Sequence, residues 1–113
     1  MDLRELTTDE ELQAVFERSS DRPQLIFKHS STCPISGAAH SQMLSYLAGS
    51  PAPGVDYSLI VVQTSRPLSS QVAERLGVRH ESPQALLVKD GAATWNASHF
   101  DITVAALTSA LPG

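Results

Sequence analysis

The sequence has one cysteine and few basic residues. Cys33 is the single cysteine among 113 residues, so an internal disulfide and a zinc site built from several cysteines are both excluded. Lys and Arg number 8 against 12 Asp and Glu, and the net charge of −4 without a basic cluster argues against a nucleic-acid partner. No apolar run approaches the roughly 20 residues that span a bilayer, which argues against a membrane partner.

The beginning of the chain lacks the features of a secretory signal. Residues 1–5 carry acidic side chains where a signal peptide has basic residues and then an apolar run, so we expect a cytoplasmic protein. Repeats and interdomain linkers are also absent, and the length suits one hydrophobic core. We therefore expect residues 1–113 to form one domain. No long apolar edge is evident, and we expect a monomer.

Four helices are predicted from signals at their first residues. Thr8 and Glu11 have the spacing of a capping box, and Thr103 is suited to cap a last helix. Pro34 and Pro67 suit the first turn of two further helices, because the missing N–H of proline has no helical partner there. The apolar residues that follow these signals recur at helical spacing.

The segments between these helices predict strands. Short apolar runs at 25–27, 57–62 and 85–89 are typical of buried strands. Asp90-Gly91 favours a tight turn into a last strand at 92–96. Strands separated by helices pair in parallel through right-handed crossovers, whereas the final hairpin adds antiparallel strands. These patterns predict an α/β protein with a mixed central sheet of about four strands flanked by helices.

The chemistry of the chain is expected at Cys33, between the end of a predicted strand and the helix that begins at Pro34. Unpaired N–H groups and the dipole at a helix start favour the thiolate, which is the nucleophile of thiol–disulfide exchange. The small polar residues at 30–32 favour an exposed thiol. Burial of Cys33 as a small apolar side chain is the alternative.

A dithiol redox motif would have a second cysteine three positions after Cys33, where this chain has Ser36. Without an internal resolving thiol, Cys33 can only form a mixed disulfide and pass it to an external thiol. The pattern predicts monothiol exchange, with the Ser36 hydroxyl placed to hydrogen-bond the sulfur.

Several other polar residues are expected near Cys33. His29 ends the preceding strand, and a protonated His29 would stabilise the thiolate; capping of backbone carbonyls is the alternative. Arg79 and His80 precede a strand at the same edge, where one or the other would favour an anionic thiol ligand. The histidines fall on different predicted elements without the spacing of a zinc motif, so we expect no metal.

From about Gln24 to Leu111, this arrangement resembles the thioredoxin fold. A strand leads into a cysteine-initiated helix, and a second strand–helix unit, a Ser-Pro pair, a hairpin and a helix follow. By itself, Ser82-Pro83 suits a cis or a trans bond. The resemblance implies that Pro83 is cis and faces Cys33. It also implies that the backbone of Glu81 and Ser82 pairs with an extended substrate by strand addition.

More narrowly, Thr32-Cys33-Pro34-Ile35-Ser36, preceded by Lys28-His29-Ser30, resembles the monothiol bacilliredoxins of the YtxJ group, and so does the segment 95–103. These are bacterial general stress proteins linked to bacillithiol. The resemblance implies that Cys33 attacks a protein–bacillithiol mixed disulfide, releases the protein and keeps the bacillithiol until another thiol removes it. The implied partners are S-thiolated client proteins and a low-molecular-weight thiol, with bacillithiol as co-substrate and no bound cofactor.

The expected site therefore has a catalytic residue, a supporting loop and a substrate-binding segment. In that order they are Cys33; His29, Thr32, Pro34, Ile35 and Ser36; and Glu81, Ser82 and Pro83. Two other functions remain open from the residues alone. One is a non-catalytic module that holds an extended partner at the Pro83 edge, and the other is a sensor whose Cys33 dimerises or is capped under oxidative stress.

Overall fold

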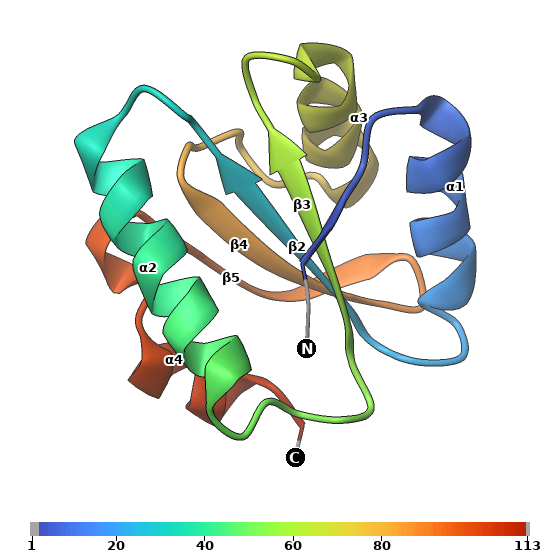
Figure 1. Ribbon diagram of the computed structural model, residues 1–113. Coiled ribbons are helices and arrows are strands. Elements are labelled where there is room, and N and C mark those ends of the chain that lie inside the picture. The colour runs from blue at the N-terminus through green and yellow to red at the C-terminus, as the bar shows by residue number, and fades with distance from the viewer. Residues whose placement is uncertain (1–2, 113) are drawn as a thin grey trace.

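The computed structural model describes residues 3–112, which form one five-stranded sheet between two pairs of helices (Figure 1). The expectations for the amino terminus and for a domain of 1–113 extend to Met1, Asp2 and Gly113, which lie outside the described residues. The strands are β1 (Arg4–Glu5), β2 (Gln24–His29), β3 (Asp56–Val61), β4 (Gln84–Lys89) and β5 (Ala92–Ser98). The helices are α1 (Asp9–Arg18), α2 (Pro34–Ala48), α3 (Arg66–Leu76), α4 (Val104–Ala110) and the 3-10 turn η1 (His99–Asp101).

The sheet has the strand order β1-β3-β2-β4-β5. β3 is parallel to β1 and to β2, while β4 is antiparallel to both β2 and β5. The predicted α/β architecture, a mixed sheet with helices on both faces, is confirmed, but the sheet has five strands rather than about four. The additional strand, β1, consists only of Arg4 and Glu5, which are both exposed. Two exposed residues carry no apolar periodicity, so this strand exists only through its pairing with β3.

Local sequence signals set the helix starts and the hairpin turn as predicted. Thr8 and Glu11 form a complete capping box on α1, and the Thr103 hydroxyl accepts a hydrogen bond from the backbone of α4. Pro34 is at the start of α2. Asp90 and Gly91 both have positive φ, 52° and 75°, which is the geometry of a type I′ turn.

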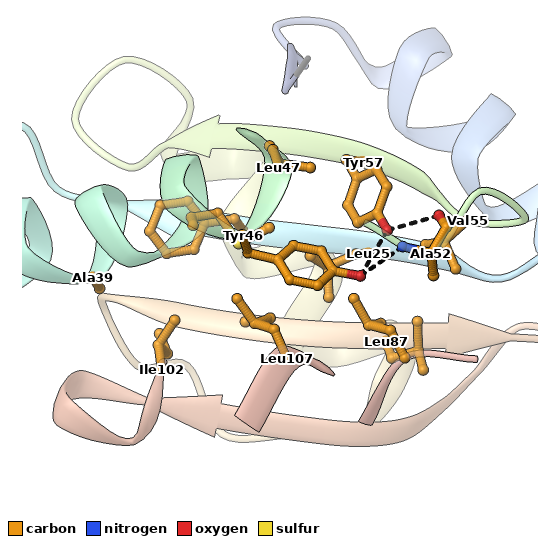
Figure 2. Packing of buried hydrophobic residues seen from close by; sticks show 14 residues of the cluster. Leu25, Ala39, Tyr46, Leu47, Ala52, Val55, Tyr57, Leu87, Ile102 and Leu107 are labelled. Carbon is orange, nitrogen blue, oxygen red and sulfur yellow. Dashed lines mark hydrogen bonds between the residues drawn. The ribbon is translucent and has the colours of Figure 1, made fainter. Parts of the chain in front are cut away.

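Each face of the sheet has its own core. α2 and α4 cover one face and α1 and α3 cover the other (Figure 1). On the α2 side, the hydroxyls of Tyr46 and Tyr57 lie 3.1 Å apart and bind the backbone of Ala52, closing a buried hydrogen-bond network (Figure 2). This network fixes the loop between α2 and β3. Among residues 3–112, no helix is long and apolar enough to cross a membrane.

The topology brings the ends of β2, β3 and the start of β4 to one edge of the sheet. β2 and β3 are parallel with His29 opposite Val61, so both strands end there. β4 is antiparallel to β2 with Lys28 opposite Gln84, so β4 begins there. The carboxyl edge of parallel strands is where open α/β sheets place their reactive groups.

Candidate functional site

Cys33 occupies the N-cap position of α2 at this edge. Its backbone is extended, with φ −98° and ψ 122°, and its carbonyl accepts the first helical hydrogen bond from Gly37 at 3.0 Å. The side chain is partly exposed and makes no capping hydrogen bond. The predicted placement of the thiol at a helix start is confirmed. Partial exposure also distinguishes Cys33 from a fully buried core cysteine.

The Ser36 hydroxyl binds His29 and Ser30. Ser36 is fully buried, and its Oγ accepts a hydrogen bond from the Ser30 N–H at 2.8 Å and lies 2.9 Å from Nδ1 of His29. A serine hydroxyl has one proton and two acceptor sites, so the direction of the contact with His29 depends on the tautomer of the imidazole. Among residues 3–112 the Ser36 hydroxyl makes no hydrogen bond to the Cys33 sulfur, and such a bond in a mixed disulfide stays a prediction. Ser36 fixes the loop before Cys33 instead.

His29 is a neutral member of this site. Burial lowers the pKa of His29, and the charge of His40 lowers it further, against an opposing effect of a hydrogen bond with the Ser36 backbone. The two imidazole rings are 4.5 Å apart. A histidine pKa below the ordinary value of about 6.5 leaves the ring uncharged at neutral pH. His29 therefore supplies no positive charge for a thiolate at neutral pH, which corrects the expected role of a protonated His29.

Gln63 also contributes to the site and was not predicted from the sequence. From the loop after β3, its Oε1 accepts a hydrogen bond from the Ser31 N–H at 3.1 Å. Its Nε2 donates to the hydroxyls of Ser30 and Thr32 at 2.7 and 3.1 Å. One side chain thus binds all three residues that precede Cys33. The available signal was position, because Gln63 is the first polar residue after the apolar run at 57–62.

The remaining residues of the expected supporting loop begin α2. Pro34 occupies the first turn and is exposed, while Ile35 is half-buried. Proline at this position leaves no backbone N–H unpaired. These two residues set the direction in which α2 leaves Cys33, and neither makes a side-chain hydrogen bond.

The Ser82–Pro83 peptide bond is cis, in agreement with the expectation from the resemblance. Because Lys28 pairs with Gln84, Pro83 lies beside His29 at the same sheet edge as the Cys33 loop. The Pro83 carbonyl accepts a hydrogen bond from the His99 N–H at 3.1 Å, which joins this segment to η1. Ser82 Oγ is buried and has no hydrogen-bond partner among residues 3–112.

The charged residues near Pro83 are partly engaged with one another. Glu81 forms a 3.8 Å ion pair with Arg79, and its N–H donates to Gln84 Oε1 at 3.4 Å. His80 Nδ1 lies 3.1 Å from Nζ of Lys28. Arg79 and His80 do lie on the segment that leads to Pro83, as expected. Within residues 3–112, no three His, Cys, Asp or Glu side chains converge in a group that could hold a metal ion.

Comparison with known proteins gives consistent results across nearly the whole chain. The sequence model of one family, described as monothiol bacilliredoxin BrxC, matches residues 4–107. A solved structure of a candidate oxidoreductase with a thioredoxin fold is 34% identical, with a TM-score of 0.82 over 95% of this chain and 91% of that one.

Thioredoxins are similar in fold at much lower identity. Thioredoxin from Fasciola hepatica is 15% identical with a TM-score of 0.74, over 95% of this chain and 94% of that one. Thioredoxin from Malassezia sympodialis is 16% identical with the same TM-score of 0.74, over 96% and 87%. At these identities the likeness shows the fold alone.

Proposed function

The chain belongs to the monothiol bacilliredoxin family, and we propose that it removes bacillithiol from S-bacillithiolated proteins through a mixed disulfide on Cys33. The family and the thioredoxin fold support thiol–disulfide exchange as the chemistry. The observation that carries the proposal is a partly exposed Cys33 at the start of α2, with a buried Ser36 where a resolving thiol would stand.

The proposed reaction has two exchanges. In the first, the Cys33 thiolate attacks the bacillithiol sulfur of the client disulfide, a new S–S bond forms and the client thiolate leaves and takes a proton. In the second, an external thiolate attacks the mixed disulfide and restores Cys33. Each exchange breaks one disulfide and forms another, so the external thiol ends in a disulfide with bacillithiol. Ser36 cannot perform the second exchange, because a hydroxyl is not a thiol.

The client is proposed to lie along the segment before Pro83. Strand addition there would pair backbone groups of Glu81 and Ser82 with an extended client segment. The register of β2 and β4 supports this, because it places Pro83 beside the end of β2 and the loop that carries Cys33. Thr32, Pro34 and Ile35 border the thiol on the same edge.

Intact-mass spectrometry tests the proposal directly. A cysteine peptide that carries bacillithiol is mixed with the native chain and with Cys33→Ser. We expect the mass of one bacillithiol on the native chain only, together with free peptide thiol. An adduct that stays on the peptide in both samples would overturn the proposal and favour a non-catalytic binding module. A peptide that carries glutathione is the matched control for the identity of the small thiol.

A further inference from the structure

Lys28 is a buried lysine that the proposed exchange leaves without a role. It lies on β2, between β3 and β4, and has no exposed surface. Lysine is almost never fully buried unless its charge is paired. Among residues 3–112, Lys28 forms no salt bridge. Burying an ammonium group lowers the free energy of unfolding. The contacts of Lys28 therefore indicate what a lysine at this position is for.

The Lys28 ammonium joins three parts of the chain. Its Nζ donates to the backbone carbonyl of Ser69 in α3 at 3.2 Å. It also lies 3.1 Å from Nδ1 of His80, on the segment 78–83 that has no helix or strand. An ammonium has no lone pair, so His80 must be the acceptor. The proton of the neutral imidazole is then on Nε2.

This contact lies beside the expected client-binding backbone. Lys28 is opposite Gln84, the first residue of β4, and Pro83 directly precedes that strand. Gln84 is also buried and donates to the Arg79 carbonyl at 3.0 Å. Two buried side chains thus hold the middle of the segment 78–83: Gln84 binds its backbone, and Lys28 binds His80. Of the two, Lys28 is the one anchored on the strand that leads to Cys33.

We propose that Lys28 is a positioning residue for thiol exchange, which holds the segment 78–83 through His80 so that Glu81 and Ser82 can receive the client. This inference rests on the proposed function. It assigns a purpose to a buried charge that the stability of the fold does not require, since an apolar side chain in the same space would avoid the desolvation penalty.

The charges around the pair define the pH range in which the contact is strongest. Burial lowers the pKa of Lys28 to about 8, so the amine is mostly protonated at neutral pH. Burial first, and then the Lys28 and Arg66 charges, lower the pKa of His80, while Glu81 opposes them. A charged donor therefore meets a neutral acceptor near neutral pH. At lower pH His80 is protonated and faces the Lys28 ammonium as a second cation. At higher pH Lys28 loses its charge.

The contact is tested by NMR and amide hydrogen exchange on the native chain, Lys28→Met and His80→Ala. Lys89→Met is the matched control, because it makes the same change on an exposed lysine at the end of β4. We expect Lys28→Met to raise the pKa of His80 and both site variants to speed amide exchange over 78–82 about tenfold. Unchanged amide exchange in both would overturn the proposal. His80→Ala removes the acceptor at an exposed position and leaves the hydrogen bond from Lys28 to the Ser69 carbonyl in place.

Thiol transfer from the bacillithiol-carrying peptide tests the functional part. We expect transfer to slow about tenfold or more in Lys28→Met and in His80→Ala, since small displacements of a binding site have effects of this size. Alkylation of Cys33 by iodoacetamide should keep its native rate. If the transfer rate and the alkylation rate of Cys33 fall equally, the substitution acts on the thiol itself and the positioning role is overturned. A transfer rate equal to the native one would overturn the positioning role as well. If the native chain transfers nothing, the proposed function fails and the role in exchange falls with it, while the amide data still show whether Lys28 holds the segment.

Discussion

Oγ of Ser36 lies 2.9 Å from Nδ1 of His29 and accepts the Ser30 N–H at 2.8 Å, so the residue three positions after Cys33 organises the loop before it. In a dithiol protein that position would carry a second reactive sulfur. Here the same position holds the loop before Cys33, and the proposed second exchange is left to another molecule. The hydrogen bonding of the loop thus fits the proposed monothiol exchange.

Ser36→Ala is expected to destabilise the chain and to disturb this loop. It leaves the His29 Nδ1 and the Ser30 N–H without their buried partner, and an unmade buried hydrogen bond costs about 1–3 kcal/mol. Urea unfolding measures the loss, and thiol transfer to Cys33 should slow with it. Ser41→Ala on the exposed face of α2 is the control and should change little. Equal stability of the two variants would contradict the assigned contacts.

Gln63→Leu separates loop order from global stability. Gln63 is exposed, so its hydrogen bonds to residues 30–32 add little to folding, on the order of 1 kcal/mol or less. Their loss should nevertheless free the loop before Cys33 and slow thiol transfer several-fold. Gln13→Leu, on the exposed face of α1, makes the same change away from the site. The assignment fails if the amide exchange of 30–32 and the transfer rate both match those of the Gln13 variant.

Features that depend on neighbours in sequence could be predicted, and contacts between distant segments could not. Thr8, Pro34 and Asp90-Gly91 act within one turn of chain, so helix starts and the hairpin follow from local chemistry. Gln63 reaches a loop more than thirty positions earlier, and Lys28 meets His80 across 52 positions. Such pairs are set by strand register and helix packing, which composition and periodicity do not specify.

The burial of His29 predicts a loss of stability in mild acid. Because the pKa of His29 is lowered on folding, the unfolded chain binds more protons as the pH falls below about 6.5. The contribution of His29 to the free energy of unfolding is therefore highest near pH 7. It declines as the pH falls from the pKa of His29 in the unfolded chain to its lower pKa in the folded chain. Urea unfolding at pH 7.0 and 5.5 measures this slope. His29→Gln should reduce the slope without abolishing it, since the pKa of His80 is lowered as well. An unchanged slope in the variant would place the acid sensitivity elsewhere.

Lys28→Met is expected to make the chain more stable and less active at once. The pKa of Lys28 falls from 10.5 to about 8 on folding. Between pH 8 and 10.5 the unfolded chain therefore binds more protons than the native chain, and the free energy of unfolding rises with pH over this range. Below pH 8 the native chain carries the full penalty of a buried ammonium, and Met removes it. We expect a gain of about 1–3 kcal/mol at pH 7 and a flatter pH profile between 8 and 10. Urea unfolding at pH 7, 8 and 10 measures both, with Lys89→Met expected to follow the native profile. A Lys28 variant that is less stable at pH 7 would mean that the hydrogen bonds to Ser69 and His80 outweigh the desolvation of the charge, and Lys28 would then be a structural residue.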